Sequence, residues 1–260
     1  MFKVFKYSFL DLVRSRWSYF YLFFYAVLGF GLLFINNDLS KSIITLLNVV
    51  VIITPLIGTV FGAIYYYNSL DFSKLLLSQP IKRNKIFLGQ FFGLSTSLFL
   101  SILIGLGIPF LFYGIFKHDE FIDFLYIIFI GGALTFIFSS ISYITAMLSE
   151  DKTKGIGISI VLWLFFALIY DGLILIALVY FKDYPLDNFI IFSSIFNPID
   201  LSRTLILLKF DMSALLGYTG AVIQMFFGTN KGIVTILIVM FFWITIPLKI
   251  ISHISKNKDY

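Results

Sequence analysis

Residues 70–90, LDFSKLLLSQPIKRNKIFLGQ, are a compact, charged and proline-punctuated stretch between two long apolar runs. Asp71 and Lys74 lie three residues apart among its leucines, a spacing that predicts a short amphipathic helix with one wet side. Pro80 ends that helix. The edge of the next apolar run then carries three basic residues, Lys82, Arg83 and Lys85. Because basic residues at the edge of a span mark its cytoplasmic side, the stretch predicts a cytoplasmic helix between two spans, with an ordinary basic inner loop as the alternative.

The composition of the whole chain points to a membrane. The 260 residues are 60% hydrophobic and 13% charged, which a water-facing surface cannot accommodate. The absence of cysteine excludes disulfides, thiolate metal ligands and thiol redox chemistry. His118 and His253 fall on opposite predicted sides of the membrane, so we expect no metal site. The net charge of +5 reflects membrane topology rather than nucleic-acid binding.

We therefore predict an all-α polytopic membrane protein that forms a single transmembrane domain over residues 1–260. Six spans are expected, at roughly residues 18–35, 43–67, 86–116, 124–148, 156–181 and 233–251. Residues 1–16 precede them as an amphipathic helix suited to the membrane interface. Residues 182–231 are expected to be an extracytoplasmic, helical segment between the fifth and sixth spans. Placing both termini in the cytoplasm puts most of the 19 Lys and Arg residues on that side.

The outer segment contains a clear helix start. Asn197 suits the N-cap, Pro198 the first helical position and Asp200 the first turn. Arg203 follows Asp200 by three residues and can pair with it on one face of the helix. A capped interfacial helix explains the first three residues without any partner, but it does not explain Arg203.

A second helix is expected in the same segment, over residues 213–228, with its start at Asp211 or Ser213. It is too short to cross a hydrocarbon core of about 30 Å comfortably. We expect it to lie along the outer membrane interface or to dip into it. As a seventh span it would place the basic C-terminus outside, against the charge bias.

Asp171 lies near the middle of the fifth apolar run, where a carboxylate costs on the order of 2.5 to 3.5 kcal/mol. The helix around it offers no second ionisable partner. One interpretation makes Asp171 a translocation or conformational-coupling residue. The other makes it a structural carboxyl, protonated or not, that hydrogen-bonds a Ser, a Tyr or the backbone of a neighbouring span. A lone carboxylate without His, Cys or Met neighbours is a poor metal-ligand set.

A short helix followed by LLLSQPIKRNKIFLGQ and a span resembles the leucine, proline and basic pattern after the second span of ABC-2 type transporter permeases. In that family the short helix is the coupling element that docks into a cleft on the ATPase subunit. The resemblance assigns this contact to Leu70, Phe72, Leu75, Leu76, Leu77, Pro80 and Arg83. The chain departs from the pattern at Gln90, where Lys is common, and at Tyr66, Tyr67 and Asn68, where the family often has an acidic pair.

Two pieces of the outer segment refine the resemblance. NPIDLSRTLILLKFD followed by LLGYTGAV, together with Trp163 and the mid-span pair Tyr170 and Asp171, resembles NosY-type permeases, which work with the nitrous oxide reductase maturation ATPase. The resemblance implies a homodimer in the bacterial inner membrane, with ATP and Mg²⁺ bound by a separate ABC ATPase and no cofactor on this chain. It also implies a periplasmic partner of β-helix type and a role in assembling the copper sites of nitrous oxide reductase. Four residues are expected to meet that partner: Asn197, Pro198, Asp200 and Arg203.

The sequence contains no G-x-x-x-x-G-K-[ST], so the chain cannot bind ATP through a P-loop and must take its energy from another subunit. An intramembrane enzyme is disfavoured, since the predicted spans carry no His pair, Glu pair or G-x-S-x-G. Two transport hypotheses remain, the maturation permease and a generic ABC-2 exporter of lipid, peptide or drug. Neither the transported species nor its direction follows from the sequence, and force transmission without transport is equally compatible with it.

Overall fold

The computed structural model describes residues 1–36, 38–118, 120–181, 184, 186–209 and 217–258. These residues form helices joined by short connections, with no strand among them. The helices are α1 (Phe2–Val13), α2 (Arg16–Asn36), α3 (Leu39–Asn68), α4 (Leu70–Leu77), α5 (Arg83–Phe112), the 3₁₀ turn η1 (Ile115–Lys117), α6 (Phe121–Leu148), α7 (Lys152–Leu164), the π-helical turn η2 (Phe165–Ile169), α8 (Tyr170–Tyr180), α9 (Asp187–Ile195), α10 (Pro198–Lys209), α11 (Gly217–Phe227) and α12 (Asn230–Asn257).

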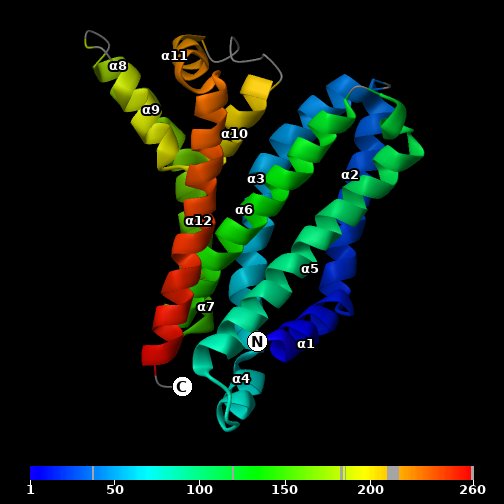
Figure 1. Cartoon of the computed structure of the whole chain (residues 1–260), viewed down its shortest axis with the longest axis vertical. Helices are drawn as coiled ribbons and strands as arrows, with labels where there is room; N and C mark the ends of the chain where they lie inside the picture. Colours follow the sequence, from blue (N-terminus) through cyan, green and yellow to red (C-terminus); the bar gives the residue numbers. More distant parts are fainter. Residues whose placement is uncertain (37, 119, 182–183, 185, 210–216, 259–260) are drawn as a thin grey trace.

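Six helical stretches in this described part are long and apolar enough to cross a bilayer. They are α2, α3, α5, α6, the continuous run of α7, η2 and α8, and most of α12. The prediction of an all-α polytopic membrane protein is thereby confirmed. α4 and both chain termini lie at the same end of the bundle, which we call the α4 end (Figure 1). α1 lies across this end and packs on the first turns of α5, with Val4 and Ser8 buried.

The third span is shorter than the apolar run suggests. The sequence predicts it to continue to residue 116, but α5 ends at Phe112. Gly114 has φ +80°, a left-handed conformation that ends an α-helix and that glycine adopts without steric cost. Ile115–Lys117 then form a separate 3₁₀ turn, so the apolar residues there belong to the connection rather than to the span.

α3 and α6 form the centre of the bundle, and small residues bring them together. A Cβ atom on Gly62 of α3 would lie 2.8 Å from the carbonyl oxygen of Ser139 on α6, closer than real Cβ contacts allow. The Ser142 hydroxyl of α6 donates a hydrogen bond to the Thr59 carbonyl of α3. Small residues on both helices therefore allow this close approach.

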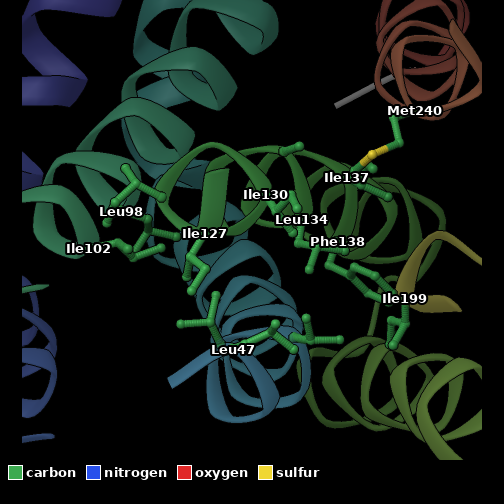
Figure 2. Packing of buried hydrophobic residues seen from close by; sticks show 14 of the residues in the cluster. Leu47, Leu98, Ile102, Ile127, Ile130, Leu134, Ile137, Phe138, Ile199 and Met240 are labelled. Carbon is green, nitrogen blue, oxygen red and sulfur yellow. The ribbon is translucent and has the colours of Figure 1, made fainter. Parts of the chain in front are cut away.

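Apolar residues of five helices meet around this pair. Figure 2 shows Leu47 of α3, Leu98 and Ile102 of α5, Ile127, Ile130, Leu134, Ile137 and Phe138 of α6, Ile199 of α10, and Met240 of α12. In contrast, few residues of the α7, η2 and α8 run and of α12 are buried, and many of their large apolar side chains are exposed. These exposed apolar faces suit contact with lipid or with another transmembrane chain.

In the structure, the described part of the segment between the fifth and sixth spans folds back toward the middle of the bundle. α9 runs from the top of α8 back toward the middle of the molecule, and α10 then turns away by 111° (Figure 1). Hydrogen bonds join the bend to residues near the middle of two spans. Trp243 Nε1 of α12 donates to the Ile195 carbonyl at 3.1 Å, and Asn197 Nδ2 donates to the Phe166 carbonyl at 2.9 Å.

We call α9 and α10 the re-entrant hairpin and residues 195–198 its vertex. Irregular backbone at this depth is tolerated only when protein groups satisfy it, and the vertex meets this condition. The later helix of the outer segment, α11, has 11 residues and is too short to cross a bilayer. The start expected for it at Asp211 or Ser213 lies outside the described residues.

Candidate functional site

The vertex is organised by one side chain. Asn197 Oδ1 accepts from the backbone N–H of Ile199 at 3.0 Å, which confirms its predicted role as the N-cap of α10. Its Nδ2 donates to the carbonyl of Phe166 in the π-helical turn of the fifth span. Asn197 and Pro198 are both buried, so in this structure they present no surface to an outer partner. Asn197 holds the vertex against the fifth span through its bond to Phe166.

The fifth span is interrupted beside the vertex. η2 replaces about one turn of α-helix with π-helix, a feature that occurs frequently at functional sites. Directly after it, the Tyr170 hydroxyl donates to the Ser193 carbonyl of α9 at 2.6 Å. Trp163 lies two residues before η2 and donates to the Ile52 carbonyl of α3 at 3.3 Å. The Trp and Tyr of the sequence motif therefore join the fifth span to two different neighbours.

Asp171, Asp200 and Arg203 form a charged triplet between α8 and α10. Arg203 Nη1 lies 2.9 Å from Asp171 Oδ2 and 3.3 Å from Asp200 Oδ1, so a single nitrogen meets both carboxylates. The pairing of Asp200 with Arg203 confirms the sequence prediction. The expectation that Asp171 has no ionisable partner is wrong, because the re-entrant hairpin brings in Arg203 from 32 residues further along the chain.

All three side chains are half-buried, and they line a pocket of about 270 Å³ between α8, α9 and α10. Leucine and isoleucine side chains from α8 and α9 also line the pocket, namely Ile174, Leu175, Leu178 and Ile190. A pocket lined by both charged and apolar side chains can hold an amphipathic group.

The predicted coupling helix is present as α4, at the other end of the molecule. Leu70 packs against the core, and Phe72 stacks on Tyr7 of α1 with ring centroids 4.5 Å apart. Leu75 is 69% exposed, whereas Leu76 and Leu77 are half-buried. Leu75 is therefore the leucine of α4 that offers most surface to a partner.

The two remaining residues of the predicted docking set follow α4. Pro80 is exposed in the connection between α4 and α5. Arg83 Nη1 donates to the carbonyl of Lys258 at 3.0 Å, and the Lys258 ammonium group donates to the carbonyl of Met147. Arg83 thus joins the start of α5 to the C-terminal residues.

Trp243 is a site residue that sequence reasoning did not identify. It lies in the middle of α12, and its indole N–H satisfies the Ile195 carbonyl at the hairpin vertex. A Trp at mid-span carries a donor that lipid cannot satisfy, and this is the signal that could have identified it.

Residues 72–254 match the family described as ABC-2 family transporter protein. The chain belongs to that family. In this ABC-2 permease the matched region begins within α4 and ends in α12, so it includes the re-entrant hairpin and the charged triplet. The predicted membership in the family of ABC-2 type permeases is confirmed.

Two relatives carry the name probable ABC transporter permease protein NosY. The relative from Stutzerimonas stutzeri is 25% identical to this ABC-2 permease over 219 residues, covering 78% of this chain and 79% of the relative. The relative from Pseudomonas aeruginosa is 25% identical over 222 residues, covering 78% and 80%. These similarities support the likeness to NosY-type permeases.

Proposed function

We propose that this permease receives ATP-driven movement at α4 from a separate ABC ATPase and delivers it through the re-entrant hairpin to an outer partner, in the assembly of the copper sites of nitrous oxide reductase. The observation that carries the proposal is the joint presence, in one ABC-2 chain, of an exposed leucine on α4 and a hairpin inserted from the opposite end. The reductase is proposed as the recipient because the sequence motifs resemble NosY-type permeases, a likeness that the two relatives support. We place the chain in the bacterial inner membrane.

Contact with the ATPase belongs to the α4 end. Leu75 lies on a short helix beside polar and charged neighbours, and an exposed leucine in such a place suits insertion into a partner's groove. Lys82 and Lys85 are exposed nearby, which favours the cytoplasm for this end. ATP and Mg²⁺ are bound by the ATPase, since the sequence of this chain has no P-loop.

The end of the bundle opposite α4, which we call the hairpin end, is where the movement reaches the outer partner. Three polar contacts tie the hairpin to the fifth span, through Asn197, Tyr170 and the pair of Asp171 and Arg203, so a shift of that span carries the hairpin with it. A periplasmic protein of β-helix type is the partner proposed there. The poorly covered faces of the fifth span and of α12 leave room for a second copy of the chain. The active unit is then a homodimer with its ATPase.

Export of a lipid, a peptide or a drug is the second candidate, and the pocket beside the charged triplet favours it. A pocket of about 270 Å³ lined by both charged and apolar side chains fits part of an amphipathic molecule. The two candidates share the ATPase contact and differ in what happens at the hairpin end.

The test replaces Leu75 with Asp in the native host, with the permease tagged for purification. Leu75→Asp places a charge on the exposed leucine of α4 and should remove the ATPase from the purified complex, with loss of nitrous oxide reduction. Gln79→Asp adds the same charge at an exposed position four residues later and serves as the control. Retention of the ATPase by Leu75→Asp contradicts the contact at α4. Loss of the ATPase with a fully copper-loaded, active reductase supports the exporter instead.

A further inference from the structure

Gln90 is an uncharged polar residue at the centre of three helices. It lies on the third turn of α5 and is completely buried. Its Nε2 donates to Ser73 Oγ of α4 at 2.9 Å, and its Oε1 accepts from the Tyr143 hydroxyl of α6 at 3.2 Å. One amide therefore joins the predicted ATPase-contact helix to the third and fourth spans.

The two partners of Gln90 are as well enclosed as the amide itself. Tyr143 is 0% exposed, and Ser73 is 1% exposed although it belongs to an otherwise open helix. A primary amide carries both donors and an acceptor, so it can bind hydroxyl groups from two different helices at once. Removing the Gln90 amide breaks the connections to both neighbouring helices at once, in a buried place where a lost hydrogen bond costs more than one exposed to water. The three side chains are thus held as one unit.

Buried contacts of this kind are few on α4. Ser73 is the residue of α4 whose side chain is fully buried, and the stack of Phe72 on Tyr7 connects the other side of α4 to α1. α6, which carries Tyr143, continues past the centre of the bundle to pack against α10 of the re-entrant hairpin. Figure 2 shows Phe138 of α6 and Ile199 of α10 at that contact. A displacement of α4 that is passed to Tyr143 reaches the hairpin through a single rigid helix.

We propose that Gln90 is a positioning residue that transmits movement of α4 to α5 and α6. This inference rests on the proposed function, in which the ATPase docks on α4. Gln90 makes no contact with the ATPase in this arrangement and acts through Ser73 and Tyr143. Its loss disconnects the spans from α4 while the docking surface around Leu75 is preserved.

The experiment uses the complete complex of the permease with its ATPase and a fluorescent thiol label at one of two positions. The chain has no native cysteine, so a single introduced cysteine is labelled specifically. Lys74→Cys reports on α4, and Ile122→Cys reports on the far end of α6; both positions are exposed. Fluorescence is compared without nucleotide and with Mg-ATP and vanadate, which traps the ATPase in its cycle.

Gln90→Met keeps the length of the side chain and removes the hydrogen bonds. We expect it to retain the nucleotide-dependent change at position 74 and to lose at least half of the change at position 122. Tyr143→Phe, which removes one hydroxyl, should have the same effect and serves as a second variant if Gln90→Met does not fold. The matched control is Ser95→Ala, because Ser95 and Ser139 form a buried hydroxyl pair between α5 and α6, at 3.0 Å, that does not involve α4.

The outcomes separate the inference from the proposed function. If Gln90→Met keeps the wild-type fluorescence changes at both positions, the proposed role of Gln90 is overturned. Loss of both changes also overturns it, because Gln90 would then stabilise α4 itself rather than transmit its movement. An equal loss at position 122 in Ser95→Ala overturns it as well, since any polar contact between the spans would then suffice. A wild-type complex with no change at position 74 overturns the proposed docking on α4 itself.

Discussion

Arg203 holds two carboxylates with one nitrogen atom, and those carboxylates belong to different parts of the fold. Asp200 lies on the same helix as Arg203, whereas Asp171 lies on the fifth span. Without the guanidinium, two half-buried carboxylates would remain close together with no cation between them. Removing one partner from such a cluster leaves uncompensated charge, which costs more than the pair contributes. Arg203 is therefore the residue on which the triplet depends.

Replacing Arg203 with Gln should lower the free energy of unfolding by about 1.5 to 3 kcal/mol, the range for hydrogen bonds to charged groups. Asp171→Asn should cost less, because Arg203 keeps Asp200. Arg203→Lys should fall between wild type and Arg203→Gln, since a single ammonium nitrogen can meet both carboxylates. Thermal unfolding of the purified protein in detergent measures the order. A larger loss for Asp171→Asn than for Arg203→Gln would show that the aspartate, and not the arginine, organises the triplet.

The local half of this cluster could be predicted from sequence and the other half could not. The N-cap by Asn197 and the pairing of Asp200 with Arg203 depend on neighbours within one helical turn, which spacing reveals. The contact of Asp171 with Arg203 depends on the direction in which a later segment folds. A sequence pattern that places this segment outside the membrane leaves Asp171 without a charged partner.

Among the helices, α3 and α6 form the central pair, and the distance between them sets the positions of the helices packed around them. Their contact is close because Gly62 faces Ser139 and Ser142 with no side chain of its own. Packing of this kind, with small residues at the interface, is a main source of helix association in lipid, where burial gives no hydrophobic gain between helices. A methyl group added at this contact has to move one helix away from the other.

Gly62→Ala should therefore destabilise the protein by about 1 to 3 kcal/mol, the usual cost of overpacking. Gly31→Ala is the control, because a Cβ at Gly31 on α2 has no atom within 4 Å. It should be neutral or slightly stabilising, since alanine is the better helix former. The melting temperatures of the two variants in detergent provide the comparison. A neutral Gly62→Ala would mean that α3 and α6 can separate without loss of packing.

The long spans were predictable because the thickness of the bilayer sets a minimum apolar length that a sequence window detects. The re-entrant hairpin was not predictable in the same way. α9 and α10 have 9 and 12 residues, and apolar helices of that length occur equally at an interface and in a protein core. The contacts of the vertex with Phe166 and Trp243 show that α9 and α10 enter the bundle. Both residues lie far from the vertex in sequence.

The two ends of the bundle differ in their charged residues, and the orientation of the protein in the membrane can be measured. We expect the α4 end to face the cytoplasm, because basic residues gather there. Cysteines introduced at Lys82 and at His118, both exposed and at opposite ends, can be labelled with a membrane-impermeant thiol reagent in intact spheroplasts. Position 118 should react and position 82 should react only after the membrane is opened. Reaction of position 82 from outside would reverse the topology and with it the side on which the ATPase docks.

The π-helical turn at Phe165–Ile169 sets the rotational phase of everything that follows it in the fifth span. A π turn closes its hydrogen-bonded ring over five residues instead of four, so it takes up one more residue than an α-helical turn. One residue corresponds to about 100° of rotation around the helix axis. In an uninterrupted α-helix, Asp171 would face a direction roughly a quarter turn or more from Arg203. The extra residue in the π-helical turn therefore rotates Asp171 toward Arg203, and the charged triplet depends on this turn.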